Sequence, residues 1–360
     1  MDISLLLKIL KIAGIVIAVL VVIALIGTVY LSLTEYKPDA VEPLVVNPPA
    51  ALPAPSIGDS LSILSWNIGY AALSDDQDFF MDGGKGIRPK EKSIVETNLK
   101  AIRDFIVRQN ADISLLQEVD YSSHRSYKIN EVDYLDKSYN GVSLYAPNFR
   151  VAFVPYPLPP IGSVESGLVN MNRLNVRSAE RLRLPTPFTW PVRVANLKRA
   201  LLVEYIPLAN SDKQLVVINL HLEAYSSNEG RIAQMKVLSE TMESEYKKGN
   251  YVIAGGDFNQ TFPGIDIEKG PFAILEKDFF VPGVLSQAMI PQGFSYAVDT
   301  KTPSNRLNNK PYSRDDTTAQ HYIIDGFILS PNVKLVSVQT INLNFVNSYH
   351  NPVHLEVQLR

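Results

Sequence analysis

The sequence predicts an α/β protein in which two packed β-sheets are covered by helices and preceded by one transmembrane helix. Three observations support this fold class. Short apolar runs of strand length recur from residue 61 to residue 359, two longer segments repeat apolar residues at helical spacing, and the N-terminal segment is long and uncharged. The chain has 360 residues, of which 46% are hydrophobic, so it can build a sizeable core.

The N-terminal segment has the length and composition of a membrane anchor. Residues 12–34 carry no charge, and a helix of this length can cross a hydrocarbon core of about 30 Å. Lys8 and Lys11 precede the segment and acidic residues follow it, so the positive-inside rule places residues 1–11 in the cytoplasm and the rest outside. A cleaved signal peptide is the alternative, but its apolar region would span only about 7–15 residues. We expect a single-pass anchor in the cell membrane.

The remaining chain divides into a linker and one large domain. Residues 35–57 are rich in proline, which predicts an extended, semi-rigid stalk. Residues 58–360 show no second linker and no repeat, which indicates a single catalytic domain of roughly 300 residues. Cysteine is absent, which excludes disulfides, thiolate zinc sites and a cysteine nucleophile. The net charge of −3 does not indicate a polyanion-binding protein.

Hydrophobic periodicity orders the elements of this domain. Strands are expected at 61–68, 112–119, 149–154, 166–174, 179–184, 198–206, 214–222, 251–255, 322–330, 333–340 and 353–359. One amphipathic helix is expected around 95–106 and another over 231–246. The polar segments 69–90 and 299–321 are expected to be loops, and loops of such length are often functional.

Polar motifs end several of the apolar runs. They are Ser65-Trp66-Asn67, Gln117-Glu118, Asn219-Leu220-His221, Gly256-Asp257-Phe258-Asn259, Ile324-Asp325 and Ser348-Tyr349-His350. Strand ends in a layered α/β domain are where side chains converge on a site. Carboxylates, amides and imidazoles gathered there suit a divalent metal and a phosphate ester.

In their order and joint occurrence, these motifs resemble the endonuclease/exonuclease/phosphatase superfamily over about residues 60–360. The resemblance implies an α/β four-layer α/β/β/α sandwich of two mixed β-sheets, with a Mg²⁺-dependent site at one edge of the sheets. It also implies a hydrolase acting on phosphate ester bonds, in which Mn²⁺ could replace Mg²⁺. The motifs do not identify a subfamily.

The resemblance assigns Glu118 to the metal, with the amide oxygen of Asn67 beside it. Mg²⁺ prefers oxygen ligands and keeps several waters, so one or two protein ligands suffice. A strand-end carboxylate such as Glu118 could instead pair with a lysine. The other motifs favour the metal-ligand role.

The remaining motif residues carry the expected chemistry. The resemblance assigns Asp257 to the attacking water and Asn259 to a phosphate oxygen. His221 and His350 would hydrogen-bond the phosphate, and Asp325 would orient His350. An Asp–His pair holds the imidazole in place and favours its cationic form. The alternative is a set of local turn bonds and core histidines, which would not explain why the motifs occur together.

Two positions depart from the family pattern. Tyr349 stands where the family usually has an aspartate, and a tyrosine is not an anion at neutral pH. The outcome could be a weaker single metal site, compensation by Asp82 or Glu223, or lost catalysis. Gly69 stands where relatives that cut abasic DNA have an acid. We expect activity to be retained.

The sequence therefore predicts a membrane-anchored, extracytoplasmic, metal-dependent phosphoesterase that hydrolyses a phosphodiester or phosphomonoester by in-line attack of water. Its substrate could carry a lipid headgroup, a nucleotide or a nucleic acid, and no obligate protein partner is evident.

Two alternative functions stay open at this point. A nuclease acting on extracellular DNA or RNA is supported by the basic segment 173–199, in which the alternation of Arg177, Arg181 and Arg183 predicts a shared exposed face. Such residues also occur at solvated strand edges. A non-catalytic protein that binds phosphate ligands is supported by Tyr349.

Overall fold

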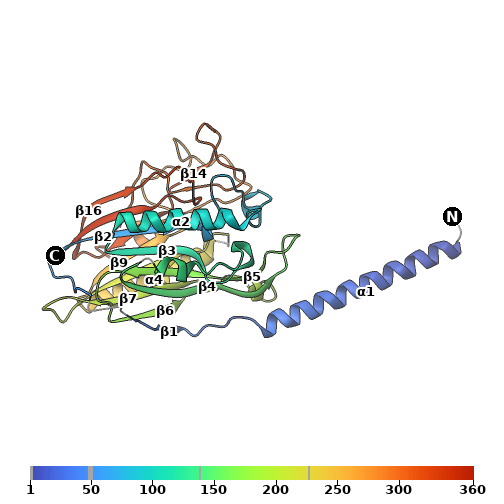
Figure 1. Ribbon diagram of the computed structural model, residues 1–360, viewed down its shortest axis with the longest axis horizontal. Helices are drawn as coiled ribbons and strands as arrows, with labels where there is room; N and C mark the ends of the chain where they lie inside the picture. The colour runs from blue at the N-terminus through green and yellow to red at the C-terminus, as the bar shows by residue number, and fades with distance from the viewer. Residues whose placement is uncertain (1–2, 48–51, 138, 226–227) are drawn as a thin grey trace.

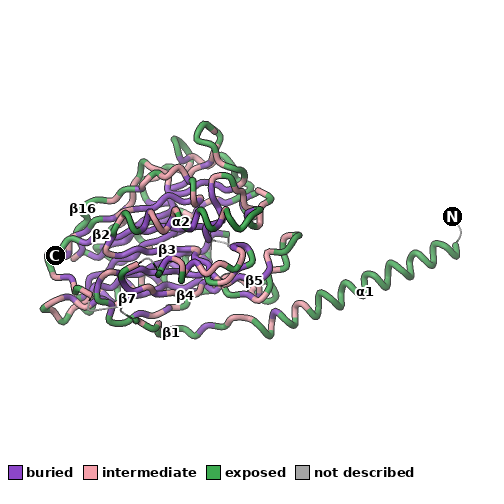
Figure 2. The backbone as a smooth tube through the Cα atoms, in the orientation of Figure 1, coloured by how far each residue is buried: buried purple, intermediate pink, exposed green. Residues whose placement is uncertain are grey.

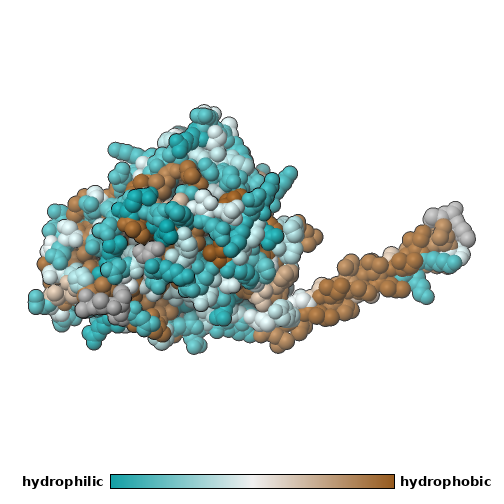
Figure 3. Space-filling model, viewed as in Figure 1, coloured by the Kyte–Doolittle hydropathy of each residue, from teal (hydrophilic) through white to brown (hydrophobic). Residues whose placement is uncertain are grey.

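The computed structural model describes residues 3–47, 52–137, 139–225 and 228–360 (Figure 1). A long helix, α1 (Ile3–Leu33), projects from a layered domain. In the described part of the chain, α1 is long and apolar enough to cross a membrane. It is exposed along nearly its whole length (Figure 2), and its surface is apolar (Figure 3). The helix begins before the predicted span 12–34 because Lys8 and Lys11 are good helix formers.

Two large mixed β-sheets make up most of the described domain. The first sheet has seven strands in the order β1 (Val41–Leu44), β6 (Ser178–Arg183), β7 (Ala200–Pro207), β8 (Gln214–His221), β9 (Tyr251–Asp257), β15 (Asp325–Leu329) and β12 (Ser295–Ala297). The second has six strands in the order β16 (Val333–Thr340), β17 (Val353–Leu359), β2 (Ser60–Asn67), β3 (Ile113–Asp120), β5 (Gly162–Asn172) and β4 (Val142–Val154). Short pairs join β10 (Gln260–Thr261) to β11 (Gly283–Val284) and β13 (Asn305–Arg306) to β14 (His321–Tyr322).

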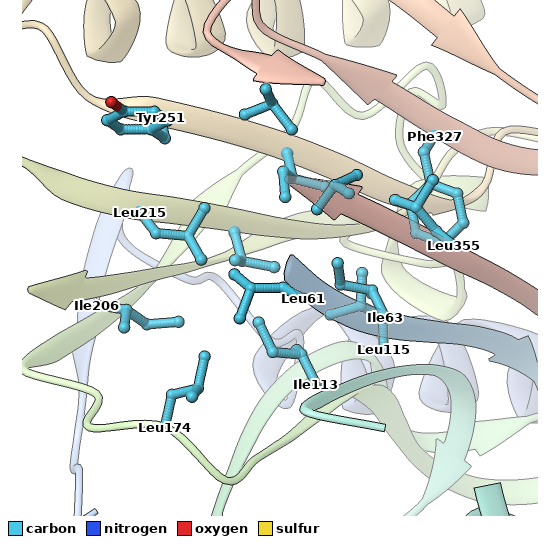
Figure 4. Packing of buried hydrophobic residues seen from close by; sticks show 14 of the residues in the cluster. Leu61, Ile63, Ile113, Leu115, Leu174, Ile206, Leu215, Tyr251, Phe327 and Leu355 are labelled. Carbon is cyan, nitrogen blue, oxygen red and sulfur yellow. The ribbon is translucent and has the colours of Figure 1, made fainter. Parts of the chain in front are cut away.

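The two sheets pack face to face between helices. Apolar residues on their facing sides form one buried cluster, part of which Figure 4 shows from close by. α2 (Lys92–Gln109) covers the outer face of the six-stranded sheet through residues such as Leu99, and α4 (Asn228–Lys247) covers the outer face of the seven-stranded sheet through residues such as Leu238. A short helix, α3 (Glu131–Asp136), was not expected. The four-layer α/β/β/α sandwich is therefore confirmed.

The predicted elements agree with the observed ones except at a few places. The strand predicted at 149–154 is the end of the longer β4. The residues Pro147 and Asn148 carry a turn signal in the sequence, but a bulge between Pro147 and Phe149 accommodates them within the strand.

Side-chain alternation decides which residues face the second sheet. Along β8, Leu215 and Val217 belong to the cluster between the sheets, whereas Val216 and Ile218 belong to the cluster under α4. Odd positions of β8 therefore point between the sheets, and His221 ends the strand on that side.

The described parts of the proline-rich segment, residues 35–47 and 52–57, do not form the free stalk that the composition predicts. β1 pairs antiparallel with β6 and completes the edge of the seven-stranded sheet. Leu44, Val46 and Leu52 pack against the cluster between the sheets. Burial of these apolar side chains stabilises the segment on the domain. Pairing of β1 with β6 also satisfies backbone groups that would otherwise be unpaired at the sheet edge.

Arg181 is also placed differently from the prediction. Arg177 and Arg183 are exposed, but Arg181 on the same strand is fully buried. Its guanidinium donates to the Pro147 carbonyl at 2.8 Å and lies 3.2 Å from a Glu42 carboxylate oxygen. β1 and the segment before it cover this face of β6, which the alternation of arginines could not indicate.

Two of the motif amides join the sheets instead of reaching the site. Gln117 and Asn219 are fully buried, and Gln117 Nε2 donates to Asn219 Oδ1 at 2.8 Å. Asn219 Nδ2 in turn donates to Asn170 Oδ1 at 2.8 Å. These bonds connect the two sheets, although Gln117 Oε1 and Asn170 Nδ2 are buried without a hydrogen-bond partner among the described residues.

A buried carboxylate beside these amides makes stability depend on pH. Glu204 is 0% exposed and accepts a hydrogen bond from Asn172 Nδ2 at 2.7 Å. Burial raises its pKa to about 7. Its protonated form is thus favoured by folding, and stability is lost as the pH rises towards and through 7. We expect Glu204→Gln to raise the free energy of unfolding by about 2 kcal/mol at pH 8, and the gain to shrink towards pH 4.5, in urea titrations. An equal gain at both pH values would contradict this explanation.

Candidate active site

Three neighbouring strands of the seven-stranded sheet bring the polar strand ends together. β8 lies beside β9 and β9 beside β15, and their registers pair His221 with Asp257 and Asp257 with Asp325. Residues directly opposite each other in a sheet have Cβ atoms about 4.5–5.5 Å apart. The three side chains therefore form a row at the edge of the space between the sheets.

Asn67, at the end of β2, joins this row from the opposite sheet. Its Nδ2 donates to Asp257 Oδ2 and to Glu118 Oε1, each at 3.0 Å. Its Oδ1 accepts a hydrogen bond from the Gly69 backbone amide at 3.0 Å. This orientation differs from the expected metal ligand, because the amide nitrogen faces the carboxylates and the amide oxygen faces the Gly69 backbone.

Glu118 leaves the regular strand pattern at a bulge. The register of β3 with β5 shifts between Leu116 and Val119, and Glu118 has a left-handed φ of 53°. A bulge redirects a side chain. While Gln117 is fully buried, Glu118 is half-buried and reaches a cavity.

His350 comes from the segment before β17, which hydrogen bonds hold against β2. Ser348 Oγ donates to the Asn67 carbonyl at 2.7 Å, and Trp66 Nε1 donates to the His350 carbonyl at 2.9 Å. These contacts place His350 Nδ1 2.8 Å from Asp325 Oδ2. The geometry brings this predicted Asp–His pair together.

Burial and charge set the protonation of the central groups. Asp257 is 1% exposed, and its Oδ2 lies 3.5 Å from His221 Nε2 and 3.6 Å from His350 Nε2. Burial, and then the nearby Asp325, raise the pKa of Asp257 to about 7. Burial lowers the pKa of His221 well below its usual range, so this imidazole is neutral. Burial also works to lower the pKa of His350, but Asp325 and Asp257 outweigh it and raise that pKa.

Asn305 contacts the same histidine, and sequence reasoning did not single it out. Its Nδ2 lies 2.8 Å from His350 Nε2, and the two residues form an isolated β-bridge. With the Asn305 amide nitrogen facing the ring, His350 Nε2 accepts a hydrogen bond, and the ring proton is on Nδ1, facing Asp325. If the ring were an imidazolium, both nitrogens would carry protons, and the Asn305 amide would have to turn its oxygen towards Nε2. Asn305 lies in the polar loop 299–321, where no motif marks it.

Asn259 follows Asp257 in a tight turn with a φ of 51°. Its backbone N–H donates to Asp257 Oδ1 at 2.9 Å, and its Nδ2 donates to the Leu222 carbonyl at 2.8 Å. The side chain lines the cavity. An amide nitrogen has a second hydrogen, which leaves Asn259 able to donate to a ligand.

The two departures from the family pattern occupy the same space. A Cβ at Gly69 would lie only 3.1 Å from Tyr349 Cδ1, so the tyrosine ring fills the volume that a side chain at residue 69 would need. The Tyr349 hydroxyl donates to Glu118 Oε1 at 2.6 Å. Burial, and then the negative charge of Glu118, raise the pKa of Tyr349 well above 10, so the phenol stays protonated. Tyr349 therefore acts as a donor to Glu118.

The two acids considered as substitutes for the missing aspartate already have partners. Asp82 accepts a hydrogen bond from the Tyr225 hydroxyl at 2.8 Å. Glu223 lies 3.3 Å from the Arg199 guanidinium. Both residues line the cavity, but neither is free of a donor.

Several of these groups border one cavity of about 570 Å³. Glu118, His221, Asn259 and His350 line its polar end, and most of its other lining residues are apolar. The volume lies within the range of about 300–1,000 Å³ that is typical of small-molecule sites.

The donor set fits a hard divalent cation. Glu118, Asp257 and Asp325 place three carboxylates close together, and ligand atoms of Asp257, Asp325 and His350 lie within 4.8 Å of one another. Asp325 Oδ1 is buried without a hydrogen-bond partner among the described residues. This inner group is fully buried, however, and neither Asp257 nor Asp325 lines the cavity, whereas Glu118 does, although its Oε1 accepts hydrogen bonds from Asn67 and Tyr349. Glu118, which borders the cavity, is therefore better placed to hold a metal that keeps several waters.

Several solved structures share this layered α/β fold. The endonuclease/exonuclease/phosphatase from Beutenbergia cavernae DSM 12333 is 17% identical, with 83% of this chain and 72% of that chain covered and a TM-score of 0.56. A functionally unknown conserved protein from Enterococcus faecalis V583 is 17% identical, covering 83% and 100%, with a TM-score of 0.54. D. rerio TDP2 complexed with a single-strand DNA product is 15% identical, covering 83% and 99%, with a TM-score of 0.50. These likenesses establish the fold.

The sequence itself then assigns the family. Residues 64–341 match the model of the endonuclease/exonuclease/phosphatase family, and the chain belongs to that family. No curated protein matches the chain. The membership confirms the resemblance on which the motifs were interpreted.

Proposed function

We propose that the protein is a membrane-anchored, metal-dependent phosphoesterase whose domain lies outside the cytoplasm. One observation carries the proposal: Glu118 and both motif histidines line the polar end of a single cavity, and Asp257 Oδ2 lies 3.5 and 3.6 Å from the two histidines. Family membership supports hydrolysis of a phosphate ester. The uncharged segment 12–34 within α1 and the lysines before it support the anchor and its orientation.

Each residue has a role that its contacts allow. Mg²⁺ or Mn²⁺, held by Glu118, supplies charge neutralisation at the phosphate oxygens. Asp257 orients the attacking water and takes up its proton, since burial raises the pKa of its carboxyl to about 7. Asn259 and His221 donate to the phosphate oxygens as negative charge develops. His350 acts there in its imidazolium form, which its raised pKa favours and for which the Asn305 amide oxygen turns towards Nε2.

Positioning residues complete this proposal. Asp325 holds His350 through Nδ1. Asn67 orients both Asp257 and Glu118 through its amide nitrogen, which replaces the metal-ligand role expected from the sequence. Tyr349 orients Glu118 from the other side.

The nuclease alternative loses part of its support. Several members of the basic segment 173–199 already have acidic partners: Arg193 and Lys198 both lie near Glu35, at 2.9 and 3.3 Å. Arg181 and Arg199 are buried in ion pairs as well. These cations are not available to bind a polyanion, because each already has a carboxylate partner.

Metal removal is the direct test. The full chain in lipid nanodiscs should hydrolyse bis(4-nitrophenyl) phosphate with Mg²⁺ or Mn²⁺, lose at least about 100-fold of its rate with chelator, and recover on metal addition. The full chain is preferable to a fragment from residue 57, because that fragment lacks β1. Absence of turnover on both this diester and 4-nitrophenyl phosphate, together with phosphate binding by calorimetry, would favour the binding-only alternative.

A further inference from the structure

The cavity extends from the polar site to the base of the membrane helix. Its wall includes Phe149, Val154 and Ala195, and these same residues pack against a small apolar cluster that contains Leu31 of α1. The wall of the cavity and the end of the helix are therefore one continuous apolar structure.

Hydrogen bonds and ion pairs fix the helix end to the domain. Trp190 Nε1 donates to Ser32 Oγ at 3.1 Å. Just after the helix, Glu35 lies 2.9 Å from Arg193 Nε and 3.3 Å from Lys198 Nζ. Ser32 lies in the last turn of α1 and Glu35 just after it, so these contacts hold the helix end against the domain and restrict rotation of the domain relative to the helix.

Large apolar side chains are exposed where the cavity meets the helix. Tyr156 and Val192 line the cavity and are 69% and 58% exposed, while Leu158 and Trp190 are 89% and 59% exposed. We call these four residues the apolar rim. In Figure 1, the β4–β5 loop that carries Tyr156 and Leu158 projects from the end of the domain that carries α1, and Figure 3 shows apolar surface there.

Such exposure needs an explanation. Soluble surfaces rarely gather exposed apolar residues, and patches of this kind mark protein or membrane contacts. Trp and Tyr are enriched at membrane–water interfaces, and Trp190 of the rim contacts the last turn of α1, where a helix that crosses the bilayer leaves it. The position of α1 thus indicates that the membrane covers this apolar surface.

We propose that the apolar rim lies in the membrane interface and that the substrate is a membrane-resident amphiphile with a phosphate ester. Its apolar part enters past the rim and lies along the cavity wall, and its phosphate reaches the polar end at Glu118 and His350. This inference rests on the proposed phosphoesterase function and on α1 as the anchor. In the reaction, water adds to phosphorus, the ester P–O bond breaks, and the leaving oxygen takes the proton.

The position of the rim can be measured without any activity. The chain has two tryptophans, of which Trp66 is 2% exposed and Trp190 belongs to the rim. In nanodiscs, lipids brominated near the carbonyl end of their acyl chains should quench most of the Trp190 emission. Trp190→Phe should remove the quenched component and leave the emission of Trp66. Equal emission with brominated and ordinary lipids would overturn the proposed membrane contact.

The substrate class is tested with two esters that share one reacting group. Methyl 4-nitrophenyl phosphate and octyl 4-nitrophenyl phosphate both release 4-nitrophenolate, and the octyl ester is used below its micelle concentration. Burial of only about three of the additional methylene groups corresponds to roughly a 50-fold higher kcat/KM for the octyl ester. Val192→Asp should lower the octyl-to-methyl ratio at least about 10-fold, because it places a charge in the apolar wall.

The control is Val336→Asp. Val336 is 52% exposed on β16, at the end of the domain opposite to α1 in Figure 1, so its replacement should change neither rate. Equal kcat/KM values for the two esters would overturn the lipid inference and leave the proposed function intact. Hydrolysis of neither ester in the presence of metal, with rim quenching observed, would overturn the proposed function and the substrate class with it.

Discussion

Asp257→Asn should reduce kcat for bis(4-nitrophenyl) phosphate by about 10³-fold, a loss of about 4 kcal/mol of transition-state stabilisation. The carboxylate lies beside both histidines and accepts a hydrogen bond from Asn67, so its replacement deprives the water of its base. The amide keeps the shape of the side chain, although its single oxygen can accept only one of the bonds from Asn67 and the Asn259 backbone. KM should change little. Initial rates in nanodiscs measure this outcome.

The same substitution, which lowers kcat, should not lower the thermal stability of the fold. Burial and Asp325 raise the pKa of Asp257 to about 7, so its charged form destabilises the fold above that pH. In metal-free buffer at pH 8, Asp257→Asn should therefore keep or raise the Tm. Asp278→Asn, at an exposed position, is the matched control for rate and Tm. If the Asp257→Asn variant had the wild-type kcat, Asp257 would not act as the base in the reaction.

Glu118→Gln should weaken Mn²⁺ binding by at least about 100-fold, measured by isothermal titration calorimetry on the full chain. An amide lacks the charge that draws a hard cation, and Glu118 is the carboxylate that borders the cavity at the proposed metal position. Glu356→Gln on β17 replaces an exposed glutamate and serves as control. If Glu118→Gln left the Mn²⁺ affinity unchanged, Glu118 would not be the ligand, and the metal would instead be bound by the inner group of Asp257, Asp325 and His350.

Tyr349→Phe extends the same experiment by one step. Phenylalanine keeps the ring beside Gly69 but removes the hydrogen bond to Glu118. Residues that orient a metal ligand typically contribute 10–100-fold to affinity. A loss of about 10-fold in Mn²⁺ affinity would support the positioning role, whereas a gain would indicate that the hydroxyl competes with the metal.

The local sequence was sufficient to predict most of the fold. Alternation along β8 and helical spacing along α2 depend only on which residues are apolar, and burial of apolar surface is the main driving force of folding. The order of the motifs likewise identified the family, because strand ends carry the polar residues wherever the strands come to lie.

Contacts between distant segments could not be predicted in this way. Nothing near Arg181 in the sequence shows that β1 covers it, and nothing near Asn67 shows that a Gly69 amide takes its oxygen. Asn305 reaches His350 only because its loop forms a bridge beside that residue. Each of these outcomes depends on which partners the folded chain supplies to a polar group.

By itself, the sequence determined the layers, the family and the set of residues that could carry the chemistry, since these follow from the pattern of apolar and polar residues. Tertiary structure alone decided which atom of each polar side chain is free. It also decided that Tyr349 and Gly69 share one space and that an apolar cavity runs from the site to the end of α1. The physical reason is that hydrogen bonds and packing form between residues far apart in the chain, and the partners of buried polar atoms come from those distant segments.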